Sequence, residues 1–138
     1  MYQHKVQYYE TDKMGITHHS NYIRWMEEAR VDYLTKLGYG FEKLEENGVV
    51  SPVVDVEGKY KKSTIFPEII DITVKVEEYN GIKLKLFYEM KNARGEVVFE
   101  GRSVHGFLDE KNRLVRLDKT APEFHEILTN QLIKDNKF

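Results

Sequence analysis

Residues 8–22 read YYETDKMGITHHSNY, and the interpretation of the chain begins with them. The acid Asp12 stands between a strand-like start and Gly15, and a polar cluster then opens directly into an amphipathic helix. Unpaired backbone N–H groups and the helix dipole favour negative charge at a helix N-terminus. The stretch therefore places a carboxylate beside an element that can stabilise an oxyanion, and acyl-transfer chemistry needs both.

The helix that begins here is predicted over residues 21–37. Its apolar residues recur at three- and four-residue spacing: Tyr22, Trp25, Met26, Ala29, Tyr33 and Leu37. Gly38 and Gly40 are typical of a helix end. Residues 41–47 predict a short further helical turn.

Alternating apolar residues predict strands on both sides of this helix. The first covers residues 2–8, and later strands are expected over residues 53–62, 70–77, 82–90, 97–108 and 113–117. Asn80-Gly81 predicts a two-residue hairpin turn, and residues 122–133 predict a terminal helix. Clean alternation indicates a sheet with one covered face. We therefore expect an α+β architecture in a single domain spanning residues 1–138.

The composition argues against several classes of site and location. The chain has a formal net charge of −2 and no cysteine. It therefore has no disulfide, thiolate metal site or cysteine nucleophile, and nothing in its charge favours nucleic-acid binding. The first residues lack the apolar run of a signal peptide, and no apolar stretch is long enough to span a membrane. We expect a soluble cytoplasmic protein.

Asp12 has two interpretations from the residues alone. An aspartate in a loop before a helix is most often a cap or turn residue. Its neighbours favour catalysis, because Gly15 permits a tight or positive-φ backbone and residues 18–21 (HHSN) gather donors and acceptors at the helix start. Adjacent histidines rarely ligate one ion, so His18 and His19 predict no metal site.

The order of these motifs resembles that of a known family. Residues 9–16 (YETDKMGI), then His19-Ser20-Asn21-Tyr22 and residues 25–30 (WMEEAR), are similar to the hotdog-fold acyl-CoA thioesterases of the 4-hydroxybenzoyl-CoA thioesterase family. The similarity is greatest to the branch associated with the Tol-Pal envelope system. It implies a hotdog fold, in which an antiparallel sheet of about five strands wraps a long central helix. It also implies hydrolysis of an acyl-CoA to the free acid and coenzyme A, without a cofactor.

The resemblance further implies roles for individual residues. The family's catalytic carboxylate falls on Asp12, acting as nucleophile or as general base on water. The backbone N–H of His19 would polarise the thioester carbonyl, and the His19 side chain is a candidate to orient water or the acid. Tyr9, Gly15 and Asn21 would shape and support the substrate site.

A basic cluster near residue 60 also has two interpretations. Lys59, Lys61 and Lys62 are consistent with a solvated strand face or with edge protection. The alternative is contact with coenzyme A phosphates, for which a lysine ammonium is a suitable point charge. Ser63-Thr64 stands where the family often has a proline-alanine step. We take Lys61 and Lys62 as candidate substrate-binding residues.

The resemblance also implies a homo-oligomer with an acyl-CoA substrate. Such domains form dimers with a continuous sheet, usually paired into tetramers, and their sites lie between subunits. Asp12 and the His19 N–H are then expected to meet across a subunit interface. Three alternatives stay open: a non-catalytic hotdog protein that binds an acyl thioester or lipid, a hotdog dehydratase or hydratase, and a structural scaffold. Acyl preference, and coenzyme A against acyl carrier protein, are also open.

Overall fold

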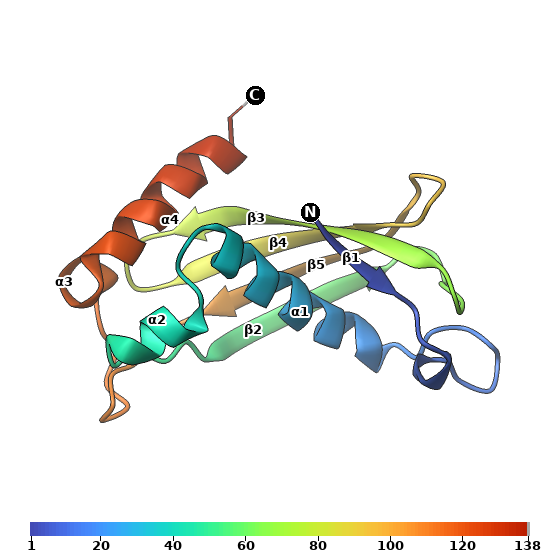
Figure 1. Cartoon of the computed structure of the whole chain (residues 1–138), viewed down its shortest axis with the longest axis horizontal. Coiled ribbons are helices and arrows are strands. Elements are labelled where there is room, and N and C mark those ends of the chain that lie inside the picture. The colour runs from blue at the N-terminus through green and yellow to red at the C-terminus, as the bar shows by residue number, and fades with distance from the viewer. Residues whose placement is uncertain (138) are drawn as a thin grey trace. The chain divides into compact units, whose positions relative to one another are not determined.

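The computed structural model describes residues 1–137, and Figure 1 shows its elements in order. The strands are β1 (Tyr2–Lys5), β2 (Val53–Tyr60), β3 (Ile69–Tyr79), β4 (Leu84–Lys91) and β5 (Val97–His105). The helices are the 3-10 helix η1 (Tyr8–Glu10), α1 (Ser20–Lys36), α2 (Phe41–Glu46), α3 (Leu117–Thr120) and α4 (Pro122–Asp135). The predicted helices at residues 21–37, 41–47 and 122–133 are confirmed with small shifts at their ends.

The five strands form one antiparallel sheet in the order β1-β3-β4-β5-β2. β1 and β2 are therefore its edge strands. The pairing of β1 with β3 places Tyr2 opposite Ile72 and Lys5 opposite Ile69. The predicted α+β class is confirmed.

The chain divides into two compact units. The first contains residues 1–33, 58–74 and 88–101, and the second contains residues 34–57, 75–87 and those from 102 onward. The single domain over residues 1–138 stays a prediction.

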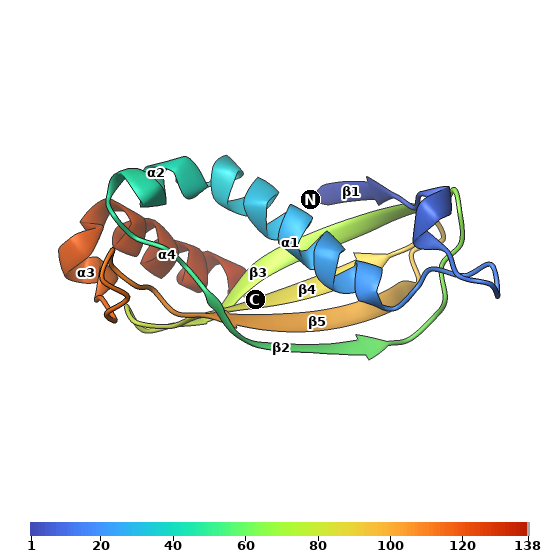
Figure 2. The same cartoon turned by 90° about the horizontal axis from the view of Figure 1, so that it is seen from below.

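In the first unit, the beginning of α1 covers one face of the neighbouring strands (Figure 2). The helix buries the side chains of Tyr22, Trp25, Met26 and Ala29, the first four members of its predicted apolar stripe. The ring of Tyr22 stacks on Phe99 of β5, with centroids 5.0 Å apart. Amphipathic spacing therefore locates the buried face correctly over the first part of α1, whereas Tyr33, the next member of the stripe, is only half-buried.

The second unit has an aromatic core of its own. The ring of Tyr39 stacks on Phe124 of α4 at 4.6 Å between centroids, and Phe107 meets Phe124 edge-on at 6.3 Å. Leu44 of α2 and Leu128 of α4 are also buried. The terminal helix thus contributes one apolar face to this core.

Two predicted turns lie at other positions in the structure. The first strand ends at Lys5, since the chain enters η1, and Tyr8 is 77% exposed. Asn80-Gly81 is not a two-residue turn, because β3 ends at Tyr79 and β4 begins at Leu84. The side-chain oxygen of Asn80 accepts the N–H groups of residues 82 and 83, which holds the longer loop.

The predicted strand at residues 113–117 is also wrong, and β5 stops at His105 rather than at residue 108. The carboxylate of Asp109 accepts the N–H groups of Lys111 and Arg113, so residues 109–113 form a tight turn. Leu108 forms only isolated bridges, one of them to Leu114. Within residues 1–137 no helix is both long and apolar enough to cross a membrane.

Gly58 of β2 is expected to be intolerant of a side chain. A Cβ atom there would lie 2.5 Å from Cζ of Phe99, whose ring is fully buried. Gly58→Ala should lower the free energy of unfolding by about 1–3 kcal/mol, because the ring must move. Urea titration measures this change. Gly106→Ala is the control, since its Cβ would meet Val54 at an ordinary 3.7 Å; equal losses in both variants would contradict the prediction.

Candidate active site

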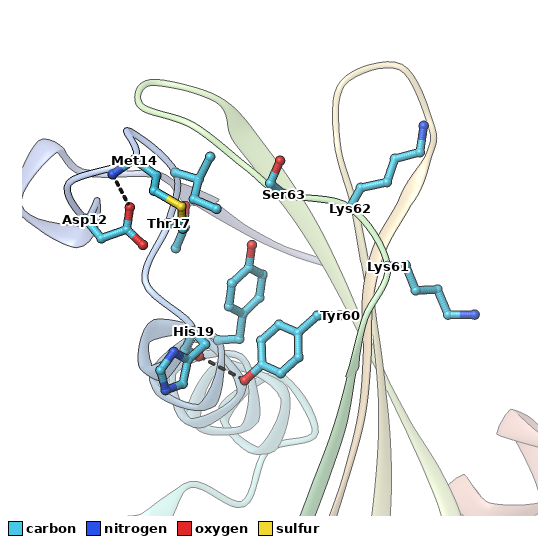
Figure 3. A pocket seen from close by; sticks show the side chains of 10 residues that line it. Asp12, Met14, Thr17, His19, Tyr60, Lys61, Lys62 and Ser63 are labelled. Atoms are coloured by element: carbon cyan, nitrogen blue, oxygen red, sulfur yellow. Dashed lines mark hydrogen bonds between the residues drawn. The ribbon is translucent and has the colours of Figure 1, made fainter.

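A cavity of about 300 Å³ opens in the first unit (Figure 3). It is lined by the loop that carries Asp12, the start of α1 and the end of β2 with the residues that follow: Asp12, Met14, Ile16, Thr17, His19, Tyr22, Tyr60, Lys61, Lys62 and Ser63. We call this cavity the pocket. It brings together four predicted site residues, namely Asp12, His19, Lys61 and Lys62.

The Asp12 loop is a tight turn closed by backbone hydrogen bonds. Thr11 and Thr17 form an antiparallel bridge across its base. The N–H of Asp12 donates to the carbonyl of Ile16 at 2.9 Å, and the N–H of Gly15 donates to the carbonyl of Asp12 at 3.0 Å. Gly15 has φ = 78°, a conformation that favours glycine. The expected tight backbone at Gly15 is therefore present.

The Asp12 carboxylate is held at one of its two oxygens. Oδ1 accepts the N–H of Met14 at 2.8 Å, which is the dashed bond at the left of Figure 3. Such a bond makes Asp12 a turn residue, as one of its two interpretations required. Among residues 1–137, Oδ2 has no hydrogen-bond donor. The turn bond therefore orients the carboxylate and leaves one oxygen available to a ligand.

The start of α1 presents an unused backbone donor. His18 N–H donates to the carbonyl of Glu10 at 2.8 Å, and Ser20 N–H donates to Nδ1 of His18 at 3.2 Å. In the part of the chain that the structure describes, the N–H of His19 between them has no acceptor. The carbonyl of His19 accepts the Tyr60 hydroxyl at 3.0 Å, which ties the helix start to β2 (Figure 3). A donor of this kind suits a developing oxyanion.

Hydrogen bonds between hydroxyl groups hold the pocket-lining residues Thr17 and Tyr22 to Thr64. Oγ1 of Thr64, which is fully buried, lies 2.6 Å from Oγ1 of Thr17 and 2.9 Å from the hydroxyl of Tyr22. The carbonyl of Thr64 also accepts both the N–H and the hydroxyl of Thr17. Burial raises the pKa of the Tyr22 phenol, so it stays neutral. These contacts fix the Asp12 loop against the segment after β2.

Three predicted site residues do not line the pocket. Tyr9 is 83% exposed and lies outside it. Gly15 shapes the turn without lining the pocket. Asn21 is buried, and its side-chain amide donates to the carbonyls of Glu10 and His18, at 2.9 and 3.3 Å. Asn21 thus supports the helix start.

Lys61 and Lys62 line the pocket, but their side chains point away from Tyr60 in Figure 3. The ammonium of Lys61 lies 3.3 Å from Oε1 of Glu100, and that of Lys62 pairs with Glu96. Hydrogen bonds from Lys62, Asn92 and Arg94 hold the pKa of Glu96 at about 2. Glu96 is therefore ionised at neutral pH, and both lysines already have carboxylate partners.

Sequence reasoning missed Thr17, Tyr60 and Thr64 as parts of the site. In the sequence, Tyr60 belongs to the predicted strand at residues 53–62, and Thr64 differs from the family's proline-alanine step; neither pattern indicates a site residue. Their roles depend on contacts between residues more than 40 positions apart. Among the described residues, no group of three His, Asp or Glu side chains is arranged to hold a metal ion.

Comparison with known proteins identifies the family. Residues 6–132 match the model described as the thioesterase-like superfamily. The chain belongs to the thioesterase-like superfamily. The predicted family, its hotdog fold and a thioester hydrolase activity are thereby confirmed. The Tol-Pal branch stays a prediction.

Individual members of this superfamily match over most of the chain. The Bacillus subtilis protein named "Putative acyl-CoA thioesterase YneP" is 36% identical over 122 residues, which cover 88% of each chain. A DHNA-CoA thioesterase from Staphylococcus aureus superposes with a TM-score of 0.92 at 34% identity, covering 99% of this chain and 94% of that one. A hypothetical protein from Aquifex aeolicus gives a TM-score of 0.85 at 28% identity, with coverage of 92% and 97%.

Removal of the Thr64 hydroxyl should lower the stability of the protein, because this hydroxyl bonds to two residues that line the pocket. Thr64→Val keeps the shape but leaves the hydroxyls of Thr17 and Tyr22 short of a buried partner. We expect the free energy of unfolding to fall by about 1–3 kcal/mol, as measured by chemical denaturation. Thr64→Ser retains the hydroxyl and should lose only about 0.8 kcal/mol for the missing methyl. A larger loss in the serine variant than in the valine variant would refute this account.

Proposed function

We propose that this enzyme hydrolyses an acyl-CoA thioester to the free acid and coenzyme A. In this proposal Asp12 is the nucleophile or general base, and the His19 N–H polarises the thioester carbonyl. The observation that carries it is the half-bound carboxylate of Asp12 in the same pocket as the unused donor at His19. The names of the Bacillus and Staphylococcus relatives support a coenzyme A thioester as substrate.

The proposed chemistry needs few groups because a thioester is already activated. As general base, Asp12 takes a proton from water, and the hydroxide attacks the carbonyl carbon. As nucleophile, its carboxylate oxygen attacks instead and forms an anhydride that water then hydrolyses. In both routes the carbonyl oxygen gains negative charge opposite the His19 N–H. The carbon–sulfur bond breaks, and coenzyme A leaves as the thiolate, which then takes a proton.

We also propose that a second copy of the chain covers the edge strand β2, as in the continuous sheet implied by the resemblance. Every residue of β2 is exposed, including Val53, Val54 and Val56 at 45%, 55% and 36%. An uncovered edge strand rich in valine invites pairing with another chain. Sedimentation velocity tests whether the chain forms a dimer or tetramer. Asp12 and His19 of one chain line the same pocket, so the proposed chemistry does not need them to meet across a subunit interface, and that expectation stays a prediction. A cytoplasmic location stays a prediction.

Asp12→Asn is the decisive variant for the catalytic acid. Asparagine keeps a side-chain oxygen for the Met14 N–H, so the turn survives while the charge and basicity are lost. We expect kcat for acyl-CoA hydrolysis to fall at least about a thousandfold with an unchanged melting temperature. A thiol-release assay over a panel of acyl-CoA substrates measures the rate. Activity of Asp12→Asn near the original level would remove Asp12 from the mechanism. If the unmodified protein hydrolyses none of the acyl-CoA substrates, the non-catalytic acyl-thioester-binding alternative is favoured.

The variant His19→Ala distinguishes a catalytic role of the His19 backbone N–H from a catalytic role of its imidazole side chain. The variant keeps the N–H that the proposal uses, so kcat should fall by less than about tenfold. Loss of a general acid or base usually costs about a hundred- to ten-thousandfold. A loss of that size would assign the catalytic role to the imidazole of His19, which also lines the pocket.

We propose further that Lys61 and Lys62 exchange their glutamate partners for coenzyme A phosphates when substrate binds. Lys61→Gln and Lys62→Gln together should raise KM for an acyl-CoA by about tenfold. The same variant should leave KM unchanged for an acyl-pantetheine thioester, which has no phosphate. An equal increase for both substrates would show that the lysines act on the fold rather than on phosphate.

A further inference from the structure

A buried acid stands two residues before Asp12 and outside the pocket. Glu10 is 5% exposed, and each of its carboxylate oxygens has protein partners. Oε1 accepts the backbone N–H of Gln7 at 2.8 Å and lies 2.8 Å from Nε2 of His4. Oε2 accepts the indole N–H of Trp25 at 2.8 Å. The side chain therefore joins β1, η1 and the second turn of α1.

The backbone carbonyl of the same residue holds the helix start. It accepts the N–H of His18 at 2.8 Å and the side-chain amide of Asn21 at 2.9 Å. Asp12 follows two residues after Glu10, and the His19 N–H follows directly after His18. One residue thus fixes both ends of the segment that carries the catalytic acid and the oxyanion donor.

The carboxylate is held from several directions. The ring of His4 packs against that of Trp25 with centroids 4.6 Å apart and planes tilted by 34°. Nδ1 of His4 lies 3.4 Å from Oε1 of Glu28, which also accepts the hydroxyl of Tyr2 at 2.9 Å. Burial alone would raise the pKa of Glu10, but the hydrogen bonds from His4, Gln7 and Trp25 bring it below its ordinary value. Glu10 is therefore ionised at neutral pH, and both oxygens accept.

We propose that Glu10 is a positioning residue for thioester hydrolysis, whose carboxylate sets the distance between Asp12 and the His19 N–H. The inference rests on the proposed function, because it assigns those two groups to catalysis. The contacts of the Glu10 carboxylate with three elements hold the Asp12 loop more firmly than the loop's backbone hydrogen bonds alone would. Reacting groups misplaced by about 1 Å lose roughly a hundredfold in rate, so a positioning residue acts on kcat.

Glu10→Gln tests this role with little change in shape. The amide group puts a donor where the carboxylate accepts, so it opposes the indole N–H or the Gln7 and His4 donors. We expect kcat to fall about ten- to a hundredfold, with KM within about twofold of its original value. Trp25 is the single tryptophan, so its fluorescence reports the broken bond directly. A shifted emission maximum with an unchanged kcat would overturn the proposal.

Glu28→Gln is the matched control, since Glu28 faces the other nitrogen of His4 and does not touch Glu10. It should retain kcat and the emission maximum, and a loss equal to that of Glu10→Gln would overturn the proposal. Trp25→Phe removes the hydrogen-bond donor to Oε2, keeps an aromatic ring against His4, and provides the test if Glu10→Gln does not fold. It should lower kcat by about three- to tenfold with KM unchanged, and full activity would refute the role.

Failure of this inference is distinguishable from failure of the proposed function. If Asp12→Asn is inactive and Glu10→Gln is fully active, the catalytic assignment stands and the positioning role is overturned. If Asp12→Asn is fully active, the catalytic assignment fails and this inference fails with it.

Discussion

The pairing of Thr17 with Thr64 is the interaction on which the pocket depends. The carbonyl of Thr64 accepts two hydrogen bonds from Thr17, and the two hydroxyls meet in a buried site. This contact closes the Asp12 loop onto the segment after β2, and the Tyr22 hydroxyl joins it. Each buried hydroxyl would be costly without its partners, so the arrangement is held as a whole.

The pocket combines a fixed frame with two unused polar groups. One oxygen of the Asp12 carboxylate accepts a hydrogen bond within its own turn. The N–H groups on either side of His19 donate to acceptors at the helix start. Groups oriented in advance in this way need little rearrangement when charge develops on a substrate. The same features that favour an aspartate as a turn residue therefore also prepare it for chemistry, and the two interpretations are compatible.

The sequence predicts correctly those elements whose formation depends on residues close together in the chain. The apolar spacing located α1 and its buried face, because a helix presents every third or fourth residue on one side. Asp12 and His19 were predicted from the motif order in residues 8–22 and from the family resemblance, which implied that they meet across a subunit interface, whereas both line one pocket of this chain. Thr64 and Tyr60 could not be predicted in this way, because they act on residues 47 and 41 positions away. The alternation of residues 113–117 predicted a strand, but in that segment Leu114 forms a single bridge to Leu108 and α3 begins at Leu117.

The lysine–glutamate pairs beside the pocket have a consequence for how a charged ligand arrives. Lys61 and Glu100 form a neutral pair, but Glu96 is shared by Lys62 and Arg94, so that group of three carries a net positive charge. The field of the neutral pair falls off faster with distance than that of a single ammonium. Long-range attraction of an anionic ligand therefore comes from the Lys62–Glu96–Arg94 group, and dissolved salt screens it. The rate at which an anionic ligand meets this side of the pocket should accordingly fall as the salt concentration rises.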